Sequence, residues 1–205
     1  MTQITEQIHI IGVDEAGRGP WTGSVFAGAV VLNPTVTIAG LADSKKLTAK
    51  KREFLAAEIK AYALAWAVGA ASAAEVDEHN ILQATFIAMR RAVMQLPSAM
   101  RAVSHAWVDG NRDPGFEHLP TTTIIKGDAT VPAISAASIL AKVARDAESQ
   151  AMHLKYPHYG FNQHKGYGTA LHAENLLRFG PLAEHRRSFK PVAQWYKNNS
   201  ELSRL

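Results

Sequence analysis

IHIIGVDEAGRGP, residues 8–20, joins a short apolar run to two adjacent acids and then to a turn in which two glycines bracket an arginine. An apolar run of this length that ends in polar residues is typical of a buried strand, which we predict over 8–14. A second apolar run, SVFAGAVVL, predicts a strand over 24–32 and is closed by Asn33-Pro34. This part of the chain is therefore expected to form two buried strands separated by a tight glycine-rich turn.

Strands and helices alternate along the rest of the core. We predict further strands at 63–71, 106–110 and 121–128, and helices at 50–62, 81–96 and 131–157. Such alternation indicates a layered α/β fold. Short helices and basic loops are expected from about 158 onward. We interpret the chain as a single domain, with a core at about 8–157 and a C-terminal helical region at about 158–205.

The composition excludes several classes of protein. The 205 residues are 47% hydrophobic and 20% charged, which is usual for a globular protein. There is no cysteine, so disulfides and thiolate metal sites are excluded and a cytoplasmic location is expected. The first ten residues lack the basic flank and apolar core of an export signal, and no run approaches the ~18 apolar residues of a membrane span. No membrane association is expected.

Basic residues are clustered. Lysine and arginine number 22 against 18 acids, for a net charge of +4, and they gather at 45–52 and at 186–190. Such clusters are compatible with a nucleic-acid partner. Solvated surface charge is the alternative interpretation of each cluster.

Acids follow three of the predicted strands. Asp14 and Glu15 end the first, Asp109 ends the fourth and Asp128 ends the fifth. If these strands are neighbours, their ends bring four carboxylates to one edge of the sheet, a common place for a site in α/β folds. Carboxylates so close repel one another unless a cation neutralises them, and oxygen ligands suit Mg²⁺ or Mn²⁺. Two such ions about 3.5–4 Å apart can promote in-line attack of water on a phosphodiester, so the pattern favours a nuclease.

Each acid also has a structural interpretation. Asp109 can belong to a plain turn, and Asp128 can cap the helix that begins near 131. Asp14 and Glu15 point to opposite faces of a regular strand, so both can serve one site only if the chain bends there. We expect Gly17 and Gly19 to supply that bend.

Two other glycine motifs are excluded. GRGPWT, residues 17–22, has a threonine where a dinucleotide-binding motif needs its third glycine, and it precedes a predicted strand where that fold requires a helix. A phosphate-binding GxxxxGK[ST] loop is also absent, because no lysine follows Gly23.

Taken together and in order, the motifs DEAGRGP, DSKKL, WVDG, IIKGD, AASILAKVARD and HKGYGT closely resemble those of bacterial ribonuclease HII. The resemblance runs from about residue 10 to about 191. It implies a ribonuclease-H-like fold, with a central five-stranded mixed sheet flanked by helices and a C-terminal helical region that helps to hold the substrate. It also implies metal-dependent endonucleolytic cleavage of RNA in RNA/DNA hybrids, with nicking on the 5′ side of single ribonucleotides in duplex DNA to leave 3′-hydroxyl and 5′-phosphate ends.

The resemblance also implies roles for particular residues. The metal-binding, catalytic acids of the family fall on Asp14, Glu15, Asp109 and Asp128, with Mg²⁺ or Mn²⁺ as the ions. The turn that contacts the ribose 2′-hydroxyl falls on Gly17, Arg18 and Gly19, and the tyrosine at the RNA-to-DNA junction falls on Tyr167, for which a core position is the alternative. The further candidates for substrate contact are Lys45, Lys46, Lys165, Arg186 and Lys190.

Three points stay open. Asp146 can be a metal-site acid, but we favour a structural ion pair. The segment WTGSVF, with Trp21 and Ser24, departs from the family pattern directly after the turn. We expect a monomer, and the tail NNSELSRL contains no aromatic anchor for a replication clamp. The alternative functions are a nuclease or strand-transfer enzyme of the same fold that ignores the 2′-hydroxyl, and a hybrid-binding module without catalysis.

Overall fold

The structure, a computed structural model, describes residues 9–102 and 104–199. Its centre is a five-stranded sheet in the order β3-β2-β1-β4-β5. Strand β1 pairs antiparallel with β2 and parallel with β4; β2 and β3 are antiparallel, and β4 and β5 are parallel. The sheet is therefore mixed, and the expected five-stranded α/β architecture is confirmed. The strands are β1 His9–Ala16, β2 Val25–Val31, β3 Ala65–Ala71, β4 Ser104–Asp109 and β5 Thr121–Ile124.

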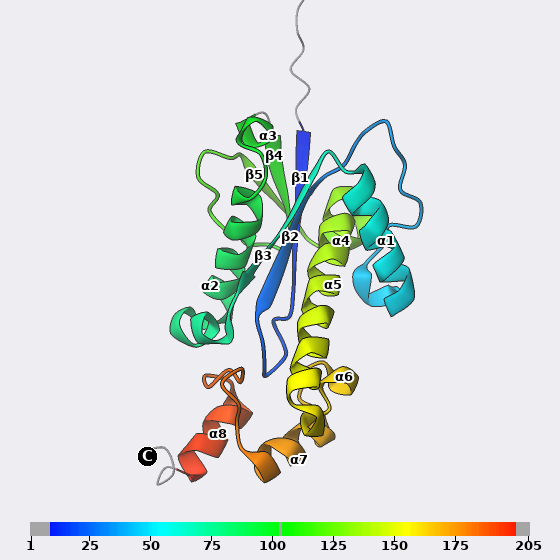
Figure 1. The fold of residues 1–205 in the computed structure, drawn as a ribbon. Coiled ribbons are helices and arrows are strands. Elements are labelled where there is room, and N and C mark those ends of the chain that lie inside the picture. The colour runs from blue at the N-terminus through cyan, green and yellow to red at the C-terminus, as the bar shows by residue number, and fades with distance from the viewer. Residues whose placement is uncertain (1–8, 103, 200–205) are drawn as a thin grey trace, which may run out of the picture.

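Helices cover both faces of the sheet and one of its ends (Figure 1). Helix α2 lies against one face, α1 and α5 lie against the other, and α6, α7 and α8 lie beyond the lower end of β1 and β2. The helices are η1 Ser44–Lys46, α1 Ala49–Tyr62, α2 Ala73–Met94, α3 Ser98–Ala102, α4 Gly127–Thr130, α5 Pro132–Lys155, η2 Pro157–Tyr159, α6 Phe161–His164, α7 Ala170–Phe179 and α8 Lys190–Asn198.

Alternation along β1 divides the core in two. Ile11 and Val13 are fully buried in the cluster that includes α2. The intervening Gly12 faces α5 so closely that a Cβ atom there would lie 2.1 Å from the backbone of Ala133. The next residue with the same orientation is Asp14, because side chains alternate along a strand. The close approach of α5 therefore covers the face on which Asp14 lies.

Helix α2 begins eight residues earlier than predicted. Ser72 and Glu75 form a reciprocal capping box, which starts the helix at Ala73. The helix is kinked at Asn80, whose φ is 65°, and Asn80 Oδ1 accepts hydrogen bonds from the backbone N–H groups of Leu82 and Gln83. The predicted helix at 81–96 corresponds to the part after this kink.

No helix within 9–102 and 104–199 is both long enough and apolar enough to cross a membrane. The expectation about an export signal concerns residues that lie mostly outside the described chain.

Candidate active site

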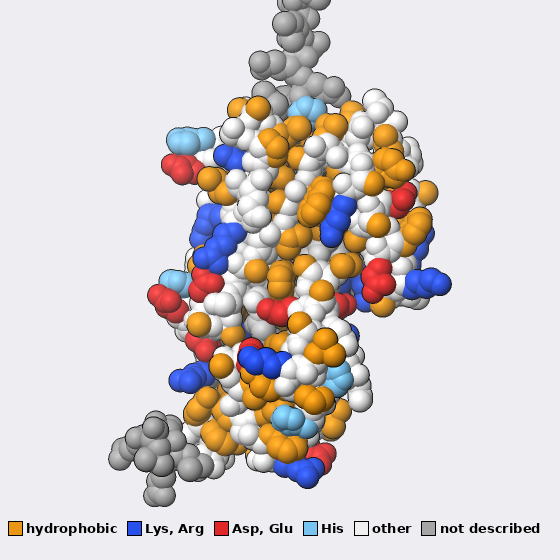
Figure 2. All heavy atoms as spheres, viewed as in Figure 1, with side chains coloured by type: hydrophobic (Ala, Val, Ile, Leu, Met, Phe, Trp, Pro, Cys, Tyr) orange, Lys and Arg blue, Asp and Glu red, His pale blue; other side chains and the backbone are white. Residues whose placement is uncertain are grey.

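Three acids from distant parts of the chain meet at one end of the sheet. Asp14, Asp109 and Asp128 each offer a carboxylate oxygen, and these oxygens lie within 4.8 Å of one another. Asp14 and Asp109 are neighbours because β1 and β4 run parallel, with Val13 opposite Val108. On the face of the molecule shown in Figure 2, acidic and basic side chains are interspersed along both sides. This group of three is the candidate active site.

Asp128 reaches the group by a different route from the one expected. Strand β5 ends at Ile124, so the prediction that Asp128 directly follows a strand is wrong. Lys126 adopts a left-handed conformation, with φ of 57°, and the chain turns into the short helix α4, which holds Asp128 in its first turn. The backbone N–H of Asp128 donates to Asp109 Oδ1 at 3.3 Å. Asp128 does not cap α5 either, because that helix starts at Pro132 and its N-cap residue is Val131, which makes no side-chain capping bond.

The expected bend after Asp14 is absent. Strand β1 continues to Ala16, with Asp14 opposite Gly28 and Glu15 opposite Ala27. Glu15 consequently lies outside the group of three, and its carboxylate forms an ion pair with Arg18 at 3.5 Å. The turn at Gly17 follows Glu15 too late to rotate its side chain toward Asp14.

Burial and mutual repulsion make the ionised state of these acids electrostatically unfavourable. Burial, and then the charge of Glu15, raise the pKa of Asp14 well above its ordinary value. Burial and then the charge of Asp109 raise the pKa of Asp128. For Glu15, burial raises the pKa, and the opposing effect of Arg18 does not cancel it. Three clustered oxygen donors with this electrostatic cost fit a divalent cation, which would neutralise them.

Lys45 is the cation nearest to the group. Its Nζ lies 3.8 Å from Asp128 Oδ2, while most of its side chain is exposed. Partial burial works to lower the pKa of Lys45, but Asp14 and Asp128 outweigh it and raise that pKa. Lys45 therefore stays charged beside the acids.

A groove beside the acids holds the predicted turn and tyrosine. It has a volume of about 260 Å³ and is lined by Glu15, Ala16, Gly17, Arg18, Gly19, Ser44, Lys45, Lys142 and Tyr167. Gly17 has a φ of 98°, which favours glycine, and a Cβ on Gly19 would lie 3.3 Å from Tyr167 Cε1. The Tyr167 side chain is 44% exposed, so it is not a core tyrosine. The structure thus brings the turn at 17–19 and Tyr167 together.

Trp21 shows how the segment WTGSVF, which departs from the family pattern, packs. Its ring lies 4.9 Å from that of His172, and Gly168 approaches it so closely that a Cβ there would meet the indole at 2.1 Å. Its backbone N–H donates to Gly166 O at 2.8 Å. Ser24 bonds to Glu148 through both its backbone N–H and its hydroxyl. Both residues therefore anchor the turn.

The other basic candidates lie in different surroundings. Lys46 is exposed in η1, and Lys190 is exposed at the start of α8. Lys165 is half-buried and lines a separate hollow with Arg52 and Asp146.

The prediction that Arg186 contacts a phosphate is wrong. Its side chain is fully buried, and its guanidinium donates to the backbone carbonyls of Gly17, Arg18, Pro20 and Gly23. Burial, and then the charge of Arg145, lower the pKa of Arg186 to about 10. No donor faces the surface, so Arg186 serves the backbone of the turn instead of a substrate.

Asp146 lies in an ion-pair network. Its carboxylate lies 2.5 Å from Lys142 Nζ, and 3.3 Å from a guanidinium nitrogen of Arg52 and of Arg145. It is not a member of the group of three. These contacts agree with the structural ion pair that we favoured.

Two residues beside the acids were not predicted. Asn111 and Arg112 line a hollow of about 300 Å³ together with Glu15, Arg18 and Asp109. Their position two and three residues after the strand-end Asp109 was the available signal, because loops that follow strand ends in α/β folds line sites.

Three buried histidines lie beside residues 166–168, which we call the Tyr167 segment. His164 and His172 are stacked with ring centroids 4.4 Å apart, and the Nε2 atoms of His172 and His185 are 3.2 Å apart. Burial lowers the pKa of His172 to about 4 and that of His185 to about 3. The charge of a neighbouring histidine adds to the lowering in each case. All three are therefore neutral at pH 7.

This cluster predicts a loss of stability in mild acid. Below the ordinary histidine pKa of 6.5, the unfolded chain binds protons that folded His172 and His185 refuse, so stability falls as the pH drops toward about 4. At pH 5 the loss is about 2 kcal/mol per histidine. Urea unfolding of the metal-free protein at pH 7 and pH 5 measures it. His172→Gln should lessen this pH dependence, whereas His118→Gln, at a highly exposed position, should not; equal slopes in all three proteins would contradict the prediction.

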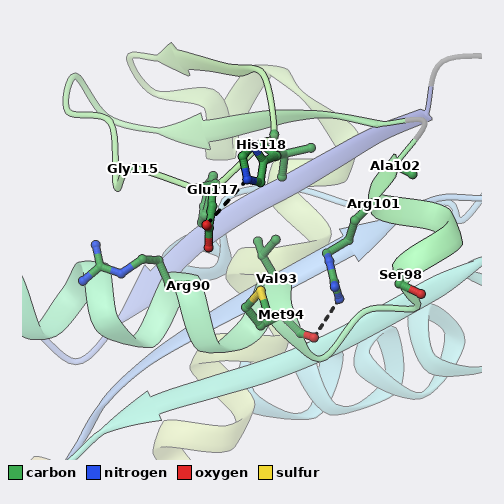
Figure 3. A pocket seen from close by; sticks show the side chains of 11 residues that line it. Arg90, Val93, Met94, Ser98, Arg101, Ala102, Gly115, Glu117 and His118 are labelled. Atoms are coloured by element: carbon green, nitrogen blue, oxygen red, sulfur yellow. Dashed lines mark hydrogen bonds and ion pairs between the residues drawn. The ribbon is translucent and has the colours of Figure 1, made fainter.

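Another hollow lies away from the acids, between α2, α3 and the segment before β5 (Figure 3). It has a volume of about 540 Å³. Arg101 bonds to the carbonyls of Met94 and Leu96, and Arg90 bonds to that of Pro114. Because its arginines are used by backbone carbonyls and its acid, Glu117, pairs with His118, the hollow offers no chemistry comparable to that of the three acids.

Comparisons with known proteins point in one direction. A family model described as ribonuclease HII matches residues 11–192. A ribonuclease HII of Bordetella avium (strain 197N) is 59% identical over 186 residues, which cover 89% of each chain. The crystal structure of ribonuclease H2 from Pyrococcus horikoshii OT3 is similar with a TM-score of 0.77 and 26% identity, over 93% of this chain and 98% of that one. A ribonuclease HII from Archaeoglobus fulgidus, solved in complex with PCNA, has a TM-score of 0.68 and 25% identity, over 89% of this chain and 96% of that one.

Proposed function

This chain belongs to the ribonuclease HII family, and from that premise we propose that it hydrolyses the RNA strand of RNA/DNA hybrids and nicks duplex DNA on the 5′ side of a single embedded ribonucleotide. The products carry 3′-hydroxyl and 5′-phosphate ends. It is an enzyme, and its fold is ribonuclease-H-like, as expected. The observation that carries the proposal is the meeting of Asp14, Asp109 and Asp128.

The acids supply the hydrolytic part of the function. Asp14, Asp109 and Asp128, with Glu15 beside them, would hold two Mg²⁺ or Mn²⁺ ions. When bound, such ions supply an activated water and neutralise charge on the leaving oxygen. Asp14 and Asp109 are held in place by the pairing of β1 with β4, and Asp128 is held by its backbone bond to Asp109.

The groove supplies the recognition of RNA. The 2′-hydroxyl, a donor and an acceptor, distinguishes ribose from deoxyribose. Gly17 and Gly19 let a sugar approach the backbone closely, and the exposed Tyr167 ring bounds the same groove. Lys45, beside Asp128, would contact a phosphate near the cut, and Lys46, Lys165 and Lys190 are further candidates for phosphates along the duplex. Such contacts position a duplex without reading its sequence.

We expect a single nick in a DNA duplex that contains one ribonucleotide. Incubation with Mg²⁺ or Mn²⁺ should cut on the 5′ side of that ribonucleotide, because only there does a 2′-hydroxyl meet the groove while a phosphodiester meets the acids. Gel analysis of an end-labelled strand, with ligation of the 3′-hydroxyl and 5′-phosphate products, measures position and end chemistry. The same duplex built entirely of DNA is the control and should remain intact.

The control also separates the alternatives. Cutting of the all-DNA duplex would favour a nuclease of the same fold that ignores the 2′-hydroxyl. Binding of a hybrid without metal-dependent turnover would favour a binding module. We further propose that the enzyme acts in the cytoplasm as a monomer. Residues 200–205, which form most of the tail considered for clamp binding, lie outside the described chain.

A further inference from the structure

Segment 20–23 links the turn at 17–19 to the rest of the C-terminal region. The backbone N–H of Trp21 donates to Gly166 O, next to Tyr167, at 2.8 Å. On the other side, the N–H of Arg186 donates to Trp21 O, and the N–H of Gly23 donates to Glu184 O. Segment 20–23 therefore lies between the Tyr167 segment and residues 184–186.

Arg186 holds the turn at 17–19 through hydrogen bonds to its backbone carbonyls. Its Nη2 donates to Gly17 O at 2.7 Å, and its Nη1 donates to Pro20 O at 2.8 Å and to Arg18 O at 3.1 Å. Its Nε donates to Gly23 O at 3.0 Å. A planar guanidinium can satisfy several carbonyls in fixed directions, whereas a lysine ammonium cannot reproduce this fork. The shape of the turn is therefore tied to one side chain.

The neighbouring His185 fastens the Tyr167 segment through a second histidine. The N–H of Leu182 donates to His185 Nδ1 at 2.9 Å, so the proton of the neutral ring lies on Nε2. That Nε2–H donates to His172 Nε2 at 3.2 Å. The His172 proton must then lie on Nδ1, which donates to Tyr167 O at 3.0 Å. The hydrogen bonds run in one direction, from Leu182 to Tyr167.

His164 supports the same segment independently. Its Nδ1 accepts from the N–H of Gly166 at 3.1 Å, and its Nε2–H therefore donates to Tyr159 O at 2.8 Å. Each ring nitrogen of the three histidines has one partner, and none of these partners is a carboxylate. The arrangement requires neutral rings in one set of tautomers.

We propose that His185 and Arg186 are a positioning pair, which holds the turn at 17–19 and the Tyr167 segment in register so that the two can read one ribose. The inference rests on the proposed function, because it concerns how that site is kept in shape. The register is tight: a Cβ on Gly19 would already lie 3.3 Å from the Tyr167 ring. Neither member of the pair lines the groove, so both act through the backbone of residues that do.

Arg186→Lys tests the first half of the pair, with Arg187→Lys as the matched control on the adjacent, exposed arginine. A misplacement of about 1 Å near a reacting group can cost about 10²-fold, so kcat/KM on a duplex with one ribonucleotide should fall by about that factor in Arg186→Lys. The loss should be clearly smaller on a continuous RNA/DNA hybrid, where neighbouring 2′-hydroxyls offer other registers. Mn²⁺ affinity measured by calorimetry should be unchanged, and Arg187→Lys should behave as the wild type.

His172 tests the second half by conservative rescue. His172→Asn keeps a donor near the Nδ1 position that faces Tyr167 O, whereas His172→Gln places its amide near the Nε2 position and loses that bond. The asparagine variant should keep most of the single-ribonucleotide activity and the glutamine variant should lose it. Equal losses on both substrates, accompanied only by a lower melting temperature, would reduce the pair to a structural role and overturn the proposal.

A measurement that needs no turnover separates this inference from the proposed function. Long-range ¹H–¹⁵N NMR of the histidine rings at pH 7 should show neutral His185 and His164 protonated at Nε2, and neutral His172 protonated at Nδ1. Amide shifts of Gly17, Gly19 and Tyr167 should move together in Arg186→Lys. If the wild type cuts nothing, the proposed function fails while these signals still test the register. Charged rings, other tautomers or unmoved amides would overturn the positioning pair even in an active enzyme.

Discussion

Replacing Asp14 by asparagine is expected to lower the rate of strand cutting by about 10³-fold or more, because the loss of a ligand from a metal site removes several kcal/mol of transition-state stabilisation. Asp14 is the most buried of the three clustered acids and comes from the central strand β1. We expect Glu15 not to take over the position of this carboxylate, because its side chain alternates with that of Asp14 along the strand and pairs with Arg18. Single-turnover cutting of a duplex with one ribonucleotide, at saturating Mg²⁺, measures the effect.

The same substitution should not unfold the protein. The negative charges of Glu15 and Asp109 oppose ionisation of Asp14, and the amide oxygen of asparagine can still accept the N–H of Glu15. We expect an unchanged or slightly higher melting temperature without metal, and a weaker stabilisation by added Mn²⁺. Glu117→Gln, at an exposed acid in the hollow of Figure 3, is the matched control and should change neither property. Turnover retained in Asp14→Asn would show that the metal ligands lie elsewhere.

Replacing Gly12 by alanine is expected to have the largest effect on stability, a loss of about 3 kcal/mol or more. The added Cβ would lie 2.1 Å from the carbonyl carbon of Ala133 and 2.4 Å from the N of Ile134, which are backbone atoms of α5. Backbone cannot rotate away as a side chain can, so either α5 must move or β1 must distort. Because Asp14 faces the same helix, activity should fall together with stability.

Gly115→Ala is the control for this prediction. A Cβ on Gly115 would meet nothing within 4 Å, although its φ of 70° disfavours alanine. Its cost should be limited to about 1–2 kcal/mol of backbone strain. Gly28→Ala is expected to resemble Gly12→Ala, because its Cβ would lie 2.3 Å from Ala137 O. Urea unfolding of these three variants and the wild type measures the order of their stabilities. A Gly12→Ala protein as stable as the wild type would contradict the close approach of α5 to β1.

The hydrophobic pattern was sufficient for the strands and for the first two acids of the site. Runs such as 8–14 and 106–110 are short, apolar and bounded by polar residues, so they predicted β1 and β4 and the position of Asp109 at a strand end. Asp14 lies on the predicted strand, but β1 continues past it to Ala16. Asp128 lies with the other acids as expected, but it does not directly follow a strand as predicted. The apolar Ile125 suggested that β5 continued, but it is 72% exposed, and the chain leaves the sheet after Ile124.

Local sequence could not distinguish a surface arginine from a buried one. Arg186 lies in the basic stretch HRRSFK, where phosphate binding is a reasonable expectation, yet it is enclosed by the turn that follows β1. Its partners are carbonyls more than 160 positions earlier in the chain. Backbone carbonyls are present at every residue and leave no trace in a sequence, so only the folded chain reveals which side chain they hold.

The amino-acid sequence by itself determined the layered α/β class, the strands that carry Asp14 and Asp109, and the glycine-rich turn, because burial period and glycine content are local properties. Only the tertiary structure decided that Asp128 joins these acids from a helix, that Glu15 lies beside them on a straight strand and pairs with Arg18, and that Arg186 is buried and bonds to the carbonyls of the turn. Those outcomes depend on which segments pack together and on where each buried donor finds its acceptor, which are relations between distant residues.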